Sequence, residues 1–99
     1  MAVLRVRARA RVEIAEAFEW YLARSSDAPA DFLAEIDAAL NLIAEAPERF
    51  PVVRGRLRRV LLRRFPYAVY DKVYPTVISV VGVIHGHRHP DSWLRLAAP

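Results

Sequence analysis

An uninterrupted apolar run, Thr76 to His85 (TVISVVGVIH), constrains the fold of this chain more than any other feature. An almost wholly apolar strand without an acidic residue, lysine or arginine is disfavoured with either face in water, so the run predicts a central strand that is covered on both faces. The Tyr74-Pro75 pair marks the turn that precedes it. The run is far shorter than the roughly 18 apolar residues that cross a bilayer as a helix.

The N-terminal half predicts one short strand and two helices. Apolar and basic residues alternate from Val3 to Arg7, which is typical of a strand with one wet face. From Ala8 to Arg24 the apolar residues follow the 3.6-residue period of a helix. Ser26 or Asp27 can cap a second helix, which Pro47 ends. Two helices with a short link predict an antiparallel hairpin that needs a partner surface.

Two more strands are predicted before the apolar run, at Leu57 to Phe65 and at Tyr67 to Tyr74. Pro66 separates them, because proline cannot donate to a strand ladder. Asp91 to Leu96 predicts a short terminal helix. The order β–α–α–β–β–β indicates an α+β fold, in which the N-terminal helical hairpin packs on one face of a small antiparallel sheet.

Length and composition indicate a single folded domain over residues 1–99, with 55% hydrophobic residues. The chain has no cysteine, which excludes a disulfide framework and thiolate chemistry. The N-terminal residues show no continuous apolar segment of a signal peptide. We therefore expect a cytoplasmic protein. No Ser–His–Asp or phosphate-loop pattern indicates a common enzyme class.

The net charge of +4 is unevenly distributed. Residues 1–11 carry four arginines and no acid, residues 12–48 carry nine acids and one base, and residues 49–99 carry ten bases and two acids. Such basic surfaces attract nucleic acid or an acidic protein. Fourteen of the fifteen bases are arginine, which suits bidentate contacts to phosphate or carboxylate. Genome composition would give the same bias, and both explanations stay open.

His85, His87 and His89 alternate at the end of the apolar run. Alternate residues of a strand share a face, and imidazoles on one face form a candidate metal site. However, no cysteine, glutamate or suitably spaced aspartate lies nearby to complete a ligand set, and Pro90 stops the strand. The pattern favours ordinary histidines at a strand end, without a metal or another cofactor.

Arginines are densest between residues 49 and 64, at Arg49, Arg54, Arg56, Arg58, Arg59, Arg63 and Arg64. They predict either a phosphate-binding platform, with Tyr67, Tyr70 and Trp93 as stacking surfaces, or an edge strand that charge protects from aggregation. Tyr67 and Tyr70 differ in parity, so at most one of them should face the core of a regular strand. Trp93 is either an apolar plug that holds the C-terminal segment on the sheet or an anchor for a partner.

Several of these segments, in this order, resemble the RelE/ParE superfamily of toxins from bacterial type II toxin–antitoxin modules. They are Glu19-Trp20-Tyr21, Pro47-x-x-Phe50-Pro51, Leu62-x-x-Phe65-Pro66-Tyr67 and Val83-x-His85-x-x-Arg88-x-Pro90-x-x-Trp93. The resemblance covers nearly the whole chain. It implies the β–α–α–β–β–β toxin fold and a hetero-oligomer with a cognate antitoxin, whose acidic C-terminal segment wraps the toxin.

The superfamily has two activities. RelE-like toxins cut mRNA in the ribosomal A site, whereas ParE-like toxins poison DNA gyrase. RelE-like members often place a basic residue near the end of the last long strand and a tyrosine shortly after it. Here Arg88 fits the first position, but Trp93 stands at the second and has no hydroxyl, and Lys72 is the one lysine. These departures favour the ParE-like branch, in which no residue is catalytic.

In that reading, eight residues form surfaces for the target or the antitoxin. They are Arg58, Arg59, Arg63, Arg64, Tyr70, His85, Arg88 and Trp93. The alternative is a ribosome-dependent endoribonuclease that uses His85, His87 and Arg88. A third reading sets the family aside and takes the chain as a small basic module that binds nucleic acid or a peptide.

Overall fold

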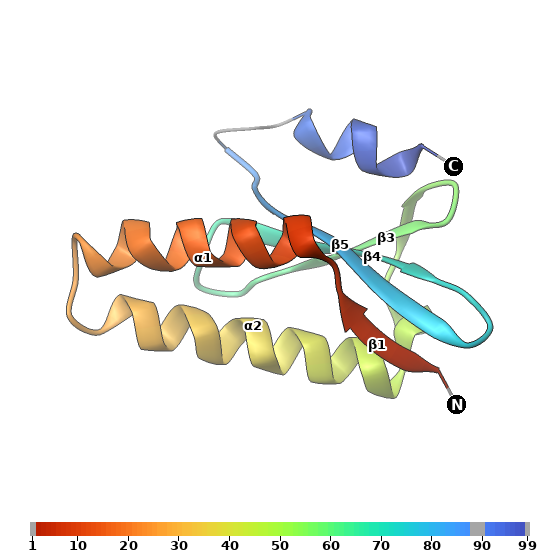
Figure 1. Ribbon diagram of the computed structural model, residues 1–99, viewed down its shortest axis with the longest axis horizontal. Coiled ribbons are helices and arrows are strands. Elements are labelled where there is room, and N and C mark those ends of the chain that lie inside the picture. Colours follow the sequence, from red (N-terminus) through yellow and green to blue (C-terminus); the bar gives the residue numbers. More distant parts are fainter. Residues whose placement is uncertain (1, 88–90, 99) are drawn as a thin grey trace.

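The computed structural model describes residues 2–87 and 91–98. Its elements in chain order are β1 (Val3–Val6), α1 (Ala8–Leu22), α2 (Ala28–Glu45), the 3-10 helix η1 (Pro47–Arg49), β2 (Val52–Arg54), β3 (Leu57–Leu61), β4 (Tyr67–Val73), β5 (Val77–His85) and the 3-10 helix η2 (Ser92–Ala97). The helical hairpin lies against a five-stranded sheet (Figure 1). The predicted α+β fold is confirmed.

The sheet has the strand order β1-β5-β4-β3-β2. The apolar run forms β5, which pairs with β1 on one edge and with β4 on the other. The β4 pairing is antiparallel, but β1 runs parallel to β5, so the sheet is mixed and the predicted all-antiparallel sheet is wrong. Most of the chain separates β1 from β5, and a long connection of this kind permits a parallel pair.

Sequence reasoning missed β2, a strand of three residues that pairs with β3 at the sheet edge. Arg54 pairs with Leu57 across a two-residue turn whose first residue, Gly55, has φ of 58°. Glycine with positive φ at this position is typical of the tight turns that join hairpin strands. The strand is too short for an alternating pattern to reveal it.

The helical hairpin and one face of the sheet enclose the main core. From α2, Phe32, Ile36 and Ile43 are fully or almost fully buried. They belong to the same cluster as Val69 and Val80 of the sheet. Burial of each such side chain contributes about 1.5–3 kcal/mol to folding. The 3.6-residue spacing of these residues explains why α2 was predictable. None of the described helices is long and apolar enough to cross a membrane.

A second apolar layer lies on the other face of the sheet, under η2. Leu57, Tyr70 and Ile84 are buried there, with Trp93 and Leu96 of η2 packed against them. The apolar-plug alternative for Trp93 therefore agrees with the structure. Both faces of β5 are covered, as its unbroken apolar run predicts.

The prediction that at most one of Tyr67 and Tyr70 faces a core is wrong. Tyr67 is 7% exposed and Tyr70 is 3% exposed. They belong to different clusters, because their opposite parity places them on opposite faces and each face has its own apolar layer. A sheet covered on both faces buries both tyrosines.

Candidate functional site

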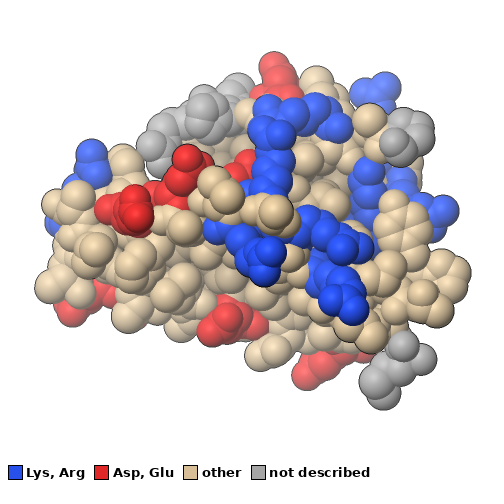
Figure 2. All heavy atoms as spheres, viewed as in Figure 1, with Lys and Arg blue, Asp and Glu red and all other residues tan. Residues whose placement is uncertain are grey.

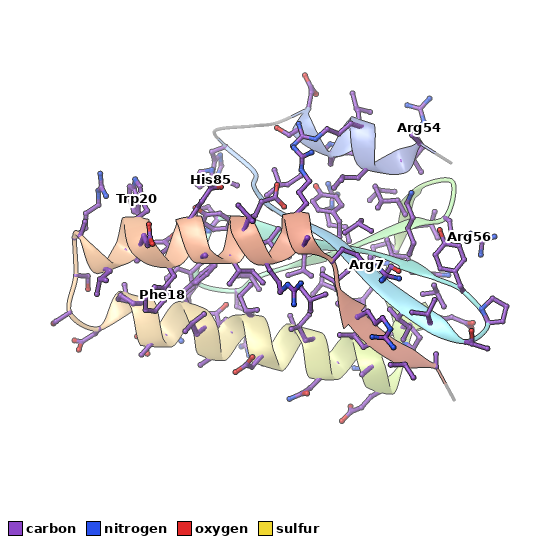
Figure 3. All side chains as sticks on the ribbon, viewed as in Figure 1. Arg7, Phe18, Trp20, Arg54, Arg56 and His85 are labelled. Atoms are coloured by element: carbon purple, nitrogen blue, oxygen red, sulfur yellow. The ribbon has the colours of Figure 1, made fainter. Side chains whose placement is uncertain are left out.

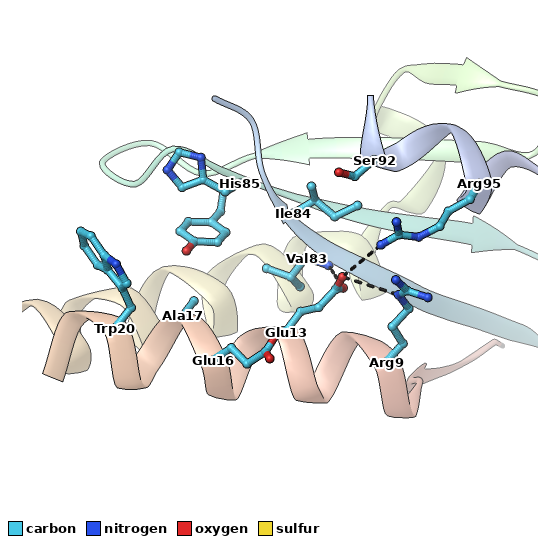
Figure 4. Close-up of a pocket in the computed structure, with 11 residues that line it drawn as sticks. Arg9, Glu13, Glu16, Ala17, Trp20, Val83, Ile84, His85, Ser92 and Arg95 are labelled. Atoms are coloured by element: carbon cyan, nitrogen blue, oxygen red, sulfur yellow. Dashed lines mark hydrogen bonds and ion pairs between the residues drawn. The ribbon is translucent and has the colours of Figure 1, made fainter. Parts of the chain in front are cut away.

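A groove of about 430 Å³ lies between α1, the end of β5 and η2 (Figure 4). Its polar and aromatic lining comes from three parts of the chain, namely Arg9, Glu13, Glu16 and Trp20 of α1, Tyr67 and His85 of the sheet, and Ser92 and Arg95 of η2. Of the seven predicted surface residues that the structure describes, His85 is the one that lines the groove. The groove therefore places one predicted residue beside several that sequence reasoning did not select.

Glu13 joins the three walls of this groove. The last pair of β1 with β5 is Val6 with Val80, so β5 has no strand partner on that side beyond Val80. The Glu13 carboxylate accepts a hydrogen bond from the Val83 N–H at 2.8 Å. It also lies 3.7 Å from Arg9 Nε and 4.0 Å from Arg95 Nη2 (Figure 4). Glu13 thus caps the open edge of β5. The helical period of the sequence indicates only that Glu13 lies on the polar face of its helix.

The other end of the groove is aromatic. The His85 and Tyr67 rings meet edge to face at 5.0 Å between centroids. The His87 N–H donates to His85 Nδ1 at 3.1 Å, and the two imidazoles lie 6.0 Å apart. Trp20 is 39% exposed, and the Arg24 guanidinium lies 4.0 Å above its ring. An imidazole and a phenol thus lie side by side, both of which can exchange protons.

Three predicted residues, Arg88, His89 and Pro90, lie outside the described residues. The metal hypothesis rests on His89 as its third imidazole. Within residues 2–87 and 91–98, no group of three or more His, Cys, Asp or Glu side chains is placed to hold a metal ion.

Several arginines of the dense run between residues 49 and 64 make contacts within the protein. Arg58 donates to the Phe50 carbonyl at 2.6 Å and lies beside Asp71 of β4. Arg56 donates to a backbone carbonyl and stacks on Tyr74, with 4.7 Å from guanidinium to ring centre. Figure 3 shows Arg54 and Arg56 near the β2–β3 hairpin, far from Trp20. Internal contacts therefore hold several members of the predicted phosphate-binding platform, which stays a prediction.

The strand predicted to extend to Phe65 ends at Leu61 in the structure, and Glu35 of α2 explains this difference. It accepts hydrogen bonds from the backbone N–H groups of Arg63 and Arg64, at 2.8 and 3.2 Å, and from Arg64 Nε at 2.7 Å. Burial acts to raise the pKa of Glu35, but these bonds and the Arg64 charge outweigh it and hold the pKa below its usual value. Arg64 is therefore part of a capped turn and does not belong to a free charged strand.

Asp71 is a fully buried carboxylate that faces Arg58 across the β3–β4 pair. Neither of its oxygens has a hydrogen-bond partner among the described residues. Burial raises the pKa of Asp71 to about 6, against the attraction of Arg58, which lowers it. A buried carboxylate without hydrogen bonds destabilises its surroundings when it is ionised.

A family model described as the ParE toxin of the type II toxin–antitoxin system parDE matches residues 4–90. The chain belongs to the ParE toxin family. The match begins in β1 and continues beyond the end of β5, so it includes the helical hairpin and the walls of the groove that come from α1 and the sheet, but not η2. The predicted membership of the RelE/ParE superfamily, and of its ParE branch, is confirmed.

One similar solved chain comes from the chromosomal ParDE toxin–antitoxin system of P. aeruginosa. The TM-score is 0.64 at 14% sequence identity, and the alignment covers 86% of this chain and 96% of that one. At this identity the likeness shows the fold alone. No curated protein sequence matches the chain.

Proposed function

We propose that this ParE-family chain inhibits DNA gyrase without catalysing a reaction of its own, and that a cognate antitoxin neutralises it. The observation that carries the proposal is the match to the ParE toxin model from β1 to beyond the end of β5. Membership of the ParE branch, whose toxins poison DNA gyrase, supports gyrase as the proposed target. The charge of the chain is asymmetric, with an acidic segment at residues 12–48 between two basic regions. Such asymmetry suits a protein that docks on a charged partner.

The groove supports a docking role more than a catalytic one. One of its two carboxylates, Glu13, is occupied by the Val83 N–H and by two arginines, whereas the other, Glu16, is exposed. Trp93 stands at the position where ribonucleases of this superfamily carry a tyrosine, and it packs into the apolar layer under η2. The mRNA endoribonuclease that uses His85, His87 and Arg88 is the alternative outcome of the tests.

For the antitoxin we propose two contacts. An apolar hollow of about 470 Å³ on the outer side of the helical hairpin is lined by Ile14, Phe18, Leu22 and Leu33, with Leu22 60% exposed. Arg11 and Glu19 stand at its lining too, but its exposed surface is almost entirely apolar, which suits an amphipathic segment of the antitoxin. The acidic part of that segment would contact exposed arginines, such as Arg63, for which opposite charge gives rapid and selective association.

Of the eight residues predicted to bind target or antitoxin, the proposal keeps Arg59, Arg63 and His85 as accessible contacts. Tyr70 is buried, Trp93 packs beneath η2, and Arg58 and Arg64 are held by internal hydrogen bonds. In this proposal these four residues shape the binding surface but do not themselves contact the target or the antitoxin. Arg88 is outside the described residues.

Controlled expression in bacteria tests the proposal. A gyrase inhibitor produces filamentous cells and a DNA damage response, and co-expression of the antitoxin restores growth. The alternative ribonuclease produces rapid translation arrest, with mRNA cuts at A-site codons in primer-extension maps. Translation arrest with such cuts, and no DNA damage response, would contradict the gyrase proposal.

A further inference from the structure

Four arginines at alternate positions of the N-terminal segment stand on one part of the surface. Arg5 and Arg7 come from β1 and the residue after it, and Arg9 and Arg11 come from the start of α1. All four side chains are exposed, and residues 1–11 contain no acid. Figure 2 shows basic side chains gathered over β1 and the beginning of α1. We call these four residues the N-terminal arginine surface.

Backbone geometry holds three of these arginines around one shallow hollow. Arg5 and Arg7 share a face because strand side chains alternate. Arg11 lies one helical turn after Arg7, and its N–H donates to the Arg7 carbonyl at 3.0 Å. Arg5, Arg7 and Arg11 line a hollow of about 400 Å³ on this surface. Figure 3 places Arg7 at the junction of β1 and α1.

Two of the four guanidinium groups are available to a partner. The guanidinium groups of Arg5 and Arg11 make no hydrogen bond or ion pair with any residue that the structure describes. Arg7 donates to Ser79 Oγ from Nε at 3.1 Å and from Nη2 at 2.9 Å, which orients it and leaves other N–H groups outward. Arg9 shares Glu13 with Arg95 at the neighbouring groove. Arg5 and Arg11, whose guanidinium groups are available, therefore lie beside Arg7, whose guanidinium is oriented by Ser79.

We propose that the N-terminal arginine surface binds the phosphate backbone of duplex DNA. Arginine presents several N–H donors in a planar fork that matches phosphate. Interfaces with DNA are polar and strongly positive, whereas protein interfaces have cores depleted in charge and enriched in aromatic residues. The hollow is lined by three arginines, Leu4, Val6 and Ala8, with no aromatic side chain. Since single-strand binding relies on aromatic stacking, duplex DNA is favoured.

This inference is independent of the proposed target. DNA binding is measured on the isolated full chain without gyrase, so the loss of either proposal leaves the other testable. The surface also differs from the arginine run between residues 49 and 64, in which internal contacts hold Arg56, Arg58 and Arg64.

The test measures binding of the purified full chain to a fluorescent 20-base-pair duplex of random sequence, by anisotropy over a range of salt concentrations. The association constant should fall steeply with salt, because each neutralised phosphate releases about 0.9 counterions. In the double variant Arg5→Gln/Arg11→Gln the affinity at a fixed low salt concentration should fall about tenfold. The slope of log affinity against log salt should shrink by about 2.

The matched control is Arg49→Gln/Arg54→Gln. It removes the same charge from exposed arginines elsewhere, whose side chains make no hydrogen bond or ion pair with a described residue. This control should keep the wild-type slope. Equal losses in both double variants would overturn the proposal, because they would reflect net charge alone. Wild-type DNA binding that does not depend on salt would also overturn it. A third outcome would also overturn the proposal. If the Arg5→Gln/Arg11→Gln variant keeps its DNA affinity but loses binding to polyglutamate, the surface fits an acidic protein and not DNA.

Discussion

The N–H of Val83 donates a 2.8 Å hydrogen bond to the carboxylate of Glu13, although 70 residues separate the two in sequence. The bond closes the edge of β5 at the point where β1 has ended. Through its ion pairs with Arg9 and Arg95, the same carboxylate also links α1 to η2. One side chain therefore fixes the shape of the groove that contains His85.

The Glu13→Ala variant tests this link. It leaves the Val83 N–H without its acceptor in a partly buried position, so we expect the free energy of unfolding to fall by about 1–3 kcal/mol. Glu13→Gln, which keeps an acceptor oxygen, should lose less. Urea denaturation of both proteins measures the effect. Glu16→Ala, an exposed neighbour in the same groove, is the control, and an equal loss in that variant would contradict the role of Glu13.

Asp71 predicts an unusual dependence of stability on pH. Because its pKa is raised from 3.8 to about 6, the folded chain binds more protons than the unfolded chain between these values. The contribution of Asp71 to the free energy of unfolding is complete below pH 3.8 and is lost as pH rises through about 6. The loss amounts to about 3 kcal/mol.

The Asp71→Asn variant, which cannot ionise, should lack this component. Chemical denaturation from pH 4 to pH 7 in both proteins gives the comparison. Relative to wild type, the variant should gain stability steadily as pH rises over this range. Parallel curves for the two proteins would show that burial of Asp71 does not shift its pKa.

Gly82 allows η2 to approach the sheet. A Cβ atom at this position would lie 2.6 Å from Leu96 Cδ1, so Gly82→Ala must displace that side chain. Because Cδ1 is the end of a partly buried side chain that can move, the cost lies at the lower end of the range for overpacking, about 1 kcal/mol. With Trp20 replaced by phenylalanine, the fluorescence of Trp93 reports on η2 and should shift to longer wavelength in Gly82→Ala.

Two further variants decide whether the Gly82 effect comes from this contact. Leu96→Ala in the Gly82→Ala protein removes the clashing atoms and should restore part of the Trp93 signal. Gly86→Ala should change little, because the nearest atom among residues 2–87 and 91–98, the Pro66 carbonyl oxygen, would lie 3.8 Å from the new Cβ. A normal Trp93 spectrum in Gly82→Ala alone would show that η2 does not need this close approach.

The apolar hollow of the helical hairpin gives a prediction for antitoxin binding. Leu22→Asp places a charge in that hollow and should weaken the affinity for the antitoxin at least tenfold, because an ionised group would have to be desolvated. The control is Leu61→Asp, at a leucine that is 67% exposed on β3, outside the hollow. Isothermal titration calorimetry compares the two. Equal affinities of both variants would place the antitoxin elsewhere.

Periodic patterns made most of the fold predictable. The apolar run marked β5 and its two covered faces, and the 3.6-residue spacing marked both helices within a few residues. The parallel direction of β1 was not predictable, because it depends on which edge of β5 the N-terminal strand reaches. Three-residue β2 is too short to show a period.

Site residues were harder to predict, because their roles depend on partners that are distant in sequence. Arg64 is bound by Glu35 from α2, and Arg58 by the Phe50 carbonyl, so arginine density alone did not reveal which side chains remain accessible. Glu13 showed no local signal beyond its position on a polar helix face. His85 was predictable because a strand end can be read directly from the sequence.

Inhibition of DNA gyrase is the central claim, and a supercoiling assay tests it most directly. Purified chain is titrated into gyrase, ATP and relaxed plasmid, with and without the cognate antitoxin. We predict that supercoiling is lost as the chain is added, that cleaved plasmid accumulates after protein denaturation, and that the antitoxin restores supercoiling. Full supercoiling at a saturating concentration of correctly folded chain would contradict the account.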